Sequence, residues 1–233
     1  EAYWDLEPTL VEQGFDACYD KRLYDRLLHG APAADLRAHL AADVAYQRHM
    51  VRFVENHDEP RAASLVPSPL HATLTAAVLT LPGVALLHEG GADGRRVHVP
   101  VMLGRRPEEP LDSDLHAAVD RVLDVLADGL RGGDWAMATV DGWPDNCSCE
   151  QLMAWTWTDT DHCWLVVVNV SGTRADGMVR VPWTDLPTRV TMLDRLADVQ
   201  YARDGAAMMA DGLYVALAPG AAHLFDITRA RGT

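Results

Sequence analysis

Positive charge is scarce in this chain of 233 residues. Lysine and arginine together number 20, against 34 aspartates and glutamates, so the formal net charge is −14 with histidine neutral. Nucleic acids and anionic membranes repel such a charge, and neither is expected as the main partner. Hydrophobic residues make up 48% of the sequence, which is too many for a disordered chain. We therefore expect one large folded domain or two ordinary ones.

Long apolar runs are also absent. The longest mostly apolar stretch, Leu74–Leu87, is interrupted by two threonines, a proline and a glycine, and is too short and broken to span a bilayer. The N-terminus shows no basic-then-apolar leader of the secretory type. From this absence we expect a cytoplasmic location.

Cysteine is sparse, with Cys18, Cys147, Cys149 and Cys163 as the only thiols. A single residue separates Cys147 from Cys149, whereas structural zinc sites usually place two or more between paired thiolates. We expect reduced thiols, with a disulfide or a metal site as the alternatives, and no metal or other cofactor in the function. The HExxH, GxSxG, P-loop and GxGxxG motifs are absent as well.

The first 131 residues alternate short strands with helices, which predicts a parallel sheet. The expected elements are strands at 15–20, 51–55 and 84–88 and helices at 34–50, 70–81 and about 113–128. In such folds the chemistry gathers beyond the carboxyl ends of the strands. Three polar clusters lie at those ends: Asp20-Lys21, Asn56-His57-Asp58 and His88-Glu89.

A glycine-rich segment at 130–134 marks the expected domain boundary. Residues 132–233 contain short β-rich runs separated by Gly, Asp, Thr and Pro, which predicts an antiparallel sheet, in the form of a small sandwich. Six of the seven tryptophans, Trp135 to Trp183, belong to this part. We expect them to fill the core or the seam between the domains, with carbohydrate contact as the alternative.

Asn56-His57-Asp58 is the sharpest candidate site. A carboxylate and an imidazole directly after a strand can address a sugar ring, and the alternative is a loop network that caps the next helix. Glu1 beside Tyr3 and Trp4 suits a general acid whose pKa is raised by apolar rings, the alternative being a solvated terminal residue. Two arginine pairs, 95–96 and 105–106, are solvated loop charges or partners of nearby carboxylates.

These segments resemble the α-amylase family, glycoside hydrolase family 13. The stretch "FVENHD", residues 53–58, matches the family's pattern of a strand Phe, two further residues and then Asn-His-Asp. "GVALLHEGG", residues 83–91, resembles the motif after the eighth barrel strand, but has Ala85 where the family usually has Pro. "EAYWDLE", residues 1–7, resembles the end of the fifth strand. The three occur in the family's order and spacing.

The resemblance implies an α/β fold: the C-terminal part of a (β/α)8 barrel over residues 1–131, from the end of strand 5 to helix 8, followed by an all-β domain over 132–233. By position, Glu1 resembles the general acid/base and Asp58 the carboxylate that stabilises the transition state. His57, Trp4 and Arg61 are expected to bind substrate, an α-glucan or a small α-glucoside.

The family acts with retention, through a covalent glycosyl–enzyme intermediate that needs a second carboxylate. That nucleophile belongs to an earlier barrel strand, and this chain has about 130 residues before the β-domain, whereas a complete barrel takes about 250. We therefore expect a fragment that is inactive alone and that needs the N-terminal barrel half. The alternatives are a transglycosylase rather than a hydrolase, or a non-catalytic carbohydrate-binding or scaffold protein.

Overall fold

The computed structural model describes residues 1–2 and 5–228. It divides into two compact units, Glu1–Asp120 and Arg121–Thr233. The division falls inside helix α7 (Ser113–Ala127). The glycine-rich segment at 130–134, where the sequence predicts the domain boundary, follows this helix.

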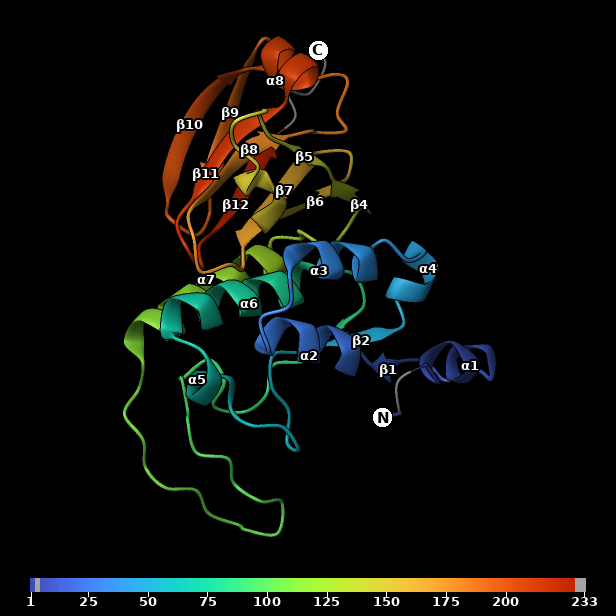
Figure 1. The fold of residues 1–233 in the computed structure, drawn as a ribbon, viewed down its shortest axis with the longest axis vertical. Coiled ribbons are helices and arrows are strands. Elements are labelled where there is room, and N and C mark those ends of the chain that lie inside the picture. Colours follow the sequence, from blue (N-terminus) through green and yellow to red (C-terminus); the bar gives the residue numbers. More distant parts are fainter. Residues whose placement is uncertain (3–4, 229–233) are drawn as a thin grey trace. The chain divides into compact units, whose positions relative to one another are not determined.

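The first unit contains a parallel three-stranded sheet. Its order is β1-β2-β3, with Cys18 opposite Met50 and Val51 opposite Val84. The strands are β1 (Cys18–Tyr19), β2 (Met50–Arg52) and β3 (Val84–Ala85). The predicted parallel sheet is confirmed, but each strand is shorter than predicted (Figure 1). The residues after β2 and β3 turn away to build loops, whereas β1 is shortened by the irregular residues 15–17 before it.

Helices precede, connect and follow these strands. They are α1 (Glu7–Glu12), α2 (Lys21–Leu28), α3 (Ala33–Leu40), α4 (Val44–Gln47), α5 (Ala62–Leu65), α6 (Ser68–Thr80) and the first part of α7. Asp20 begins α2 by accepting a 3.0 Å hydrogen bond from the Leu23 N–H. Asp112 begins α7 in the same way, by accepting from the Leu115 N–H at 3.1 Å. Short polar caps thus set where these two helices start.

The prediction of one helix over 34–50 is wrong. The structure has α3 and α4 with a break at 41–43. Asp43 leaves the helical conformation and accepts a 2.8 Å hydrogen bond from the Ala45 N–H, which starts a new helix. An aspartate favours such a cap over a helix interior because its short carboxylate competes for nearby backbone donors.

Gly83 allows β3 to approach β2 closely. It has a φ of +108°, which disfavours any residue with a side chain, and a Cβ there would collide with the carbonyl oxygen of Met50. The Pro82-Gly83 pair that ends the preceding apolar helix therefore also places the first residue of the next strand beside its neighbour.

The second unit contains two antiparallel sheets. The six-stranded sheet has the order β10-β9-β12-β7-β6-β4, and the three-stranded sheet has the order β11-β8-β5. The strands are β4 (Asp134–Ala138), β5 (Val140–Asp141), β6 (Leu152–Thr158), β7 (His162–Asn169), β8 (Ala175–Val179), β9 (Arg189–Asp194), β10 (Val199–Asp204), β11 (Leu213–Leu217) and β12 (Ala222–Thr228). A short 3₁₀ helix (Ser148–Gln151) precedes β6, and α8 (Gly205–Asp211) lies between β10 and β11.

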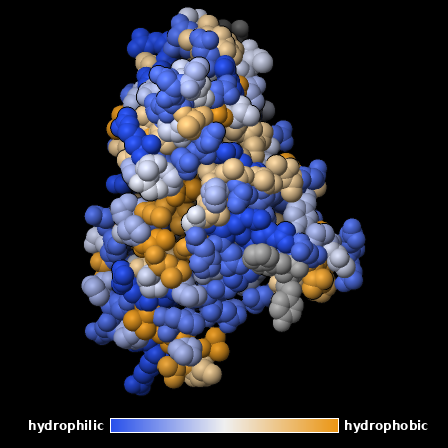
Figure 2. Space-filling view, in the orientation of Figure 1, coloured by the Kyte–Doolittle hydropathy of each residue, from blue (hydrophilic) through white to orange (hydrophobic). Residues whose placement is uncertain are grey.

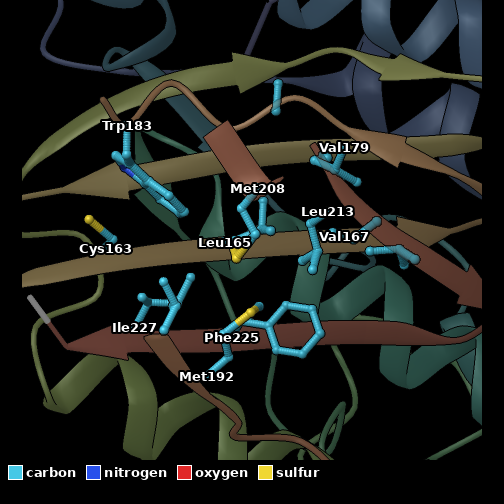
Figure 3. Close-up of a cluster of buried hydrophobic side chains, with 14 of the residues drawn as sticks. Cys163, Leu165, Val167, Val179, Trp183, Met192, Met208, Leu213, Phe225 and Ile227 are labelled. Atoms are coloured by element: carbon cyan, nitrogen blue, oxygen red, sulfur yellow. The ribbon is translucent and has the colours of Figure 1, made fainter. Parts of the chain in front are cut away.

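The two sheets share one apolar core, so the predicted sandwich is confirmed. Leu165 and Val167 of β7 pack with Val179 of β8, Leu213 of β11 and Phe225 of β12 (Figure 3). Alternating exposure along β8 and β11 is the pattern of strands with one face on a core. The tryptophans of this unit follow the core expectation, with Trp155 and Trp164 almost fully buried; Trp143 is the exception, at 39% exposed.

The four cysteines are free thiols, as expected. Cys18, Cys149 and Cys163 are buried, whereas Cys147 is exposed. Within the described residues, no helix combines the length and the apolar character needed to cross a bilayer.

Leu165→Ala is expected to destabilise the sandwich strongly. The Leu165 side chain is 0% exposed, and removing it leaves a cavity that costs about 2–5 kcal/mol. Urea unfolding followed by tryptophan fluorescence measures the loss. Leu103→Ala is the matched control, because it deletes the same atoms from a side chain that is 58% exposed. Equal effects of the two substitutions would contradict the assignment of the core.

Candidate functional site

The candidate site lies beyond the carboxyl ends of β2 and β3. The two strands run parallel, and the Leu86 N–H donates to the Arg52 carbonyl at 2.9 Å, which extends their pairing to the last residue of β2. The loops that leave the two strands therefore start side by side. Their residues are 53–61 after β2 and 86–91 after β3.

Asn56 shapes the loop after β2. Its side-chain oxygen accepts hydrogen bonds from the Asp58 and Glu59 N–H groups, both at 2.9 Å, while Asn56 itself is buried. This turn directs the next two side chains outward. His57 Nε2 lies 3.2 Å from Asp58 Oδ2, with the two side chains 50% and 53% exposed. An imidazole and a carboxylate are thus presented to solvent on a rigid base.

Glu55 and Arg61 form a buried ion pair beneath this turn. Glu55 Oε1 lies 2.8 Å from Arg61 Nη2, and Glu55 Oε2 accepts from the Ala62 N–H at 2.7 Å. Burial raises the pKa of Glu55, although the charge of Arg61 opposes this. Arg61 Nη2 also donates to the Glu89 carbonyl at 2.8 Å. One guanidinium therefore joins the loop after β2 to the loop after β3.

Gly90 and Gly91 make room for this junction. Gly90 has a φ of +77°, and a Cβ there would lie 3.1 Å from Arg61 Nη2. At Gly91, a Cβ would lie 2.9 Å from Glu55 Oε1. The two glycines after His88-Glu89 thus let the backbone pass over the buried ion pair.

A pocket of about 420 Å³ opens beside His57. Arg61, His88 and Glu89 line it, together with the loop between β3 and α7, which has no helix or strand over 86–112. His98, on that loop, donates a 2.9 Å hydrogen bond from its Nε2 to the His57 carbonyl. Figure 1 shows the loop extending away from the helices, and Figure 2 shows apolar residues near its far end, where Val101, Met102 and Leu103 are exposed.

The predicted site residues are only partly brought together. His57, Asp58 and Arg61 share one loop, with His57 and Arg61 lining the pocket. Glu1 is exposed and is not among the described residues that line this pocket. Its amino group lies near β1, where its positive charge partly offsets the rise that burial causes in the pKa of the Cys18 thiol. Trp4 lies outside the described residues.

Sequence reasoning missed several residues of the site. Glu55 and His98 are not candidates from their motifs alone, because their roles depend on loops that meet only in the fold, whereas His88 lies in a polar cluster that the sequence indicates. The two arginine pairs were the signal in the sequence that pointed to this loop. In the structure, Arg106 Nη1 lies 2.6 Å from Glu89 Oε1, and Arg95 Nη2 lies 3.6 Å from Asp93 Oδ2. For these two arginines the paired alternative is correct.

A second pocket of about 410 Å³ lies beside Asp20 and His39. Asp20 is 3% exposed, accepts from Arg52, and lies 2.9 Å from His39 Nε2. Burial alone raises the pKa of Asp20, but the hydrogen bond with His39 and the charge of Arg52 outweigh it and lower that pKa. Because Asp20 also caps α2, this cluster fastens β1, β2 and α3 together.

Metal ligation has no evident place in the part of the chain that the structure describes. No three His, Cys, Asp or Glu side chains among those residues are arranged to hold one ion.

Comparison with known proteins gives a likeness of fold. No family model and no curated protein matches the chain. Among solved structures, a noncanonic maltogenic α-amylase from Thermotoga neapolitana has a TM-score of 0.73 at 14% identity, over 96% of this chain and 54% of its own. An Anoxybacillus α-amylase gives 0.70 at 14% identity, over 99% and 52%. The Geobacillus thermoleovorans α-amylase, solved with acarbose, gives 0.68 at 15%, over 99% and 53%.

These matches cover nearly the whole chain but only about half of each α-amylase. At such low identity they establish the fold and no more. The chain has the mixed α/β and β-sandwich fold of about half of an α-amylase, as the sequence resemblance predicts.

The His71→Gln variant is expected to lose less free energy of unfolding than the parent protein when the pH falls from 7 to 4. His71 of α6 is 1% exposed, and burial, together with the charge of Arg61, lowers its pKa from 6.5 to about 4 although Asp112 opposes this. Between these two values the unfolded chain binds a proton that the folded chain does not. Stability from this group is therefore complete above pH 6.5 and falls by about 3 kcal/mol as the pH drops to 4.

Urea unfolding at pH 7 and pH 4 measures this difference for the parent protein and for each variant. His29→Gln is the control, because the His29 side chain is 68% exposed. If the parent and His71→Gln lose equal stability between the two pH values, His71 does not stay neutral in the folded protein.

Proposed function

We propose that this chain is part of a retaining, α-glucan-active glycosidase of the α-amylase family. In this proposal its first part supplies the later strands of a (β/α)8 barrel, from the end of strand 5 onward, and its second part is the β-domain that follows. The observation that carries the proposal is the half-exposed His57–Asp58 pair at the carboxyl end of a parallel strand, in a fold that matches α-amylases.

Asp58 has the chemistry that a glycosyl transition state requires. A carboxylate can accept hydrogen bonds from two sugar hydroxyls and can stabilise the positive charge that develops on the ring. His57, 3.2 Å away, can donate to a further hydroxyl. The buried side chain of Arg61 acts from below, because its pairing with Glu55 and the Glu89 carbonyl holds the loop in place. Arg61 thus positions the site besides lining it.

Glu1 is proposed as the general acid/base and Trp4 as a sugar contact. The acid protonates the glycosidic oxygen as the bond breaks, then removes a proton from the water or sugar that attacks the glycosyl intermediate. Attack by water gives hydrolysis and attack by a second sugar gives transglycosylation. The substrate proposed is an α-glucan or a small α-glucoside, supported by the acarbose bound to the Geobacillus thermoleovorans enzyme.

The nucleophile of the covalent step is proposed to come from outside these 233 residues. Retaining enzymes place it about 5 Å from the acid. Since the chain spans about half the length of the α-amylases that it matches, the strand that bears the nucleophile belongs, in this proposal, to the other half. The chain alone is then without glycosidase activity.

Asp58→Asn is expected to lower kcat/KM for a chromogenic α-maltooligosaccharide at least about 100-fold, because the amide cannot stabilise positive charge. The assay uses the longest open reading frame that contains these residues. Asp145→Asn, an exposed change in the second unit, is the matched control and should keep full activity. An Asp58→Asn variant as active as its parent would refute the proposal. So would a parent protein that binds glucan but does not cleave it, which would favour a non-catalytic binding protein.

Glu1→Gln tests the acid role separately. It is expected to lower turnover of natural α-glucans by about 10²–10⁴-fold, the usual contribution of a general acid. Substrates with an acidic phenol as leaving group need little protonation, so their cleavage to the glycosyl intermediate should slow far less. Single-turnover measurements on both substrates detect this difference. Equal losses on both would show that Glu1 does not protonate the leaving group.

A further inference from the structure

The pocket beside His57 is basic, although the chain as a whole is strongly acidic. Four arginines and three histidines line it, against two glutamates, whereas the formal net charge of the whole chain is −14. The basic residues are Arg61, Arg95, Arg105, Arg106, His57, His88 and His98. Glu55 pairs with Arg61, and Asp93 pairs with Arg95, from outside this lining. The excess of basic side chains that a ligand would meet therefore comes mainly from the exposed Arg105 and Arg106.

Three of these arginines converge on Gly90. A Cβ at this position would lie 3.1 Å from Arg61 Nη2, 3.1 Å from Arg106 Nη1 and 2.6 Å from Arg95 Cγ. The side chains reach this point from the loop after β2 and from two places in the loop after β3. The fold thus brings the guanidinium groups of Arg61 and Arg106, and the aliphatic stem of Arg95, to one wall of the pocket from separate segments.

The hydrogen-bonding capacity of these groups is not exhausted within the described residues. Arg61 is 5% exposed, and its Nε atom, like that of Arg95, is buried with no hydrogen-bond partner there. Arg106 is held by Glu89 in an ion pair whose side chains are 40% and 69% exposed. Such an exposed pair contributes little stability and can rearrange around a ligand. The two Nε atoms are shielded from solvent, so the nitrogens available to a ligand are those of the exposed Arg105 and Arg106.

The pKa of His88 is affected by the positive charge around it. Burial lowers the pKa of His88, and the charges of Arg61, His57 and His98 lower it further, while Glu89 opposes them. The lowered pKa of His88 agrees with the position of Arg61 on the same pocket wall.

We propose that this pocket binds the phosphate group of a phosphorylated sugar, next to Asp58. Guanidinium groups match phosphate oxygens with paired, charge-assisted hydrogen bonds. A volume of about 420 Å³ lies in the range of small-molecule sites. The inference rests on the proposed function in one respect, because it assigns the sugar ring to His57 and Asp58 and the phosphate to the arginines.

Binding of glucose 6-phosphate, glucose and inorganic phosphate to the 233-residue chain tests this, at constant ionic strength. The histidine ring signals in ¹H–¹³C NMR spectra report on the pocket through His57, His88 and His98. We expect glucose 6-phosphate to bind at least tenfold more tightly than glucose. Arg105→Gln and Arg106→Gln, both exposed, should each weaken that binding at least fivefold. Arg48→Gln is the matched control: it makes the same charge change at an exposed residue outside the pocket and should leave the affinity unchanged.

Equal affinity for glucose 6-phosphate and glucose would overturn the proposal. An equal loss in Arg48→Gln would do so too, since it would indicate attraction by overall charge. Inorganic phosphate that binds as tightly as glucose 6-phosphate would overturn the assignment to a sugar phosphate and identify the free anion as the ligand.

This result is separable from that of the proposed function. If glucose 6-phosphate does not bind, but a neutral maltooligosaccharide is cleaved in a manner that depends on Asp58, only the phosphate site is wrong. If the phosphate binds and no α-glucoside is cleaved, the glycosidase assignment is the one that fails.

Discussion

The candidate site depends on the buried pair of Glu55 and Arg61. Their atoms lie 2.8 Å apart, the two side chains are 1% and 6% exposed, and the same guanidinium donates to the Glu89 carbonyl. A buried pair of this kind is not a strong source of stability, because the desolvation of both charges offsets their attraction. Removing one partner, however, leaves the other charge buried and uncompensated. The pair therefore constrains where both loops can lie more than it stabilises the fold.

This constraint explains how an exposed His57–Asp58 pair can still be held in a fixed position. The turn made by Asn56 sets the local direction of the two side chains, and the ion pair beneath fixes the base of the turn. Functional side chains on loops are precise only where packing and hydrogen bonds below them remove alternatives. Here those supports come from residues on either side of the motif and from the next strand.

The sequence predicted the elements better than their ends. The apolar helix ending at Pro82-Gly83 and the long helix near 113–128 are observed within one or two residues, because strong periodicity and clear breakers agree there. Strand ends were predicted too long, since apolar residues such as Phe53 and Val54 also fill the core after the strand stops. The break between α3 and α4 depends on Asp43, whose side chain competes for a backbone N–H group and begins a new helix. An apolar spacing of four residues does not reveal this competition.

The site was predictable only to the extent that it is local. Asn56, His57 and Asp58 are adjacent in the sequence, so their pattern identified them. The hydrogen bond from Arg61 to the Glu89 carbonyl joins residues 28 apart in the sequence. The hydrogen bond from His98 to the His57 carbonyl joins residues 41 apart. Neither contact follows a sequence spacing that could be recognised in advance. The paired arginines of the long loop looked like solvent-exposed charges for the same reason. Their place follows from the parallel order of β2 and β3, which brings the two loops to one edge of the sheet and gathers four arginines around one pocket.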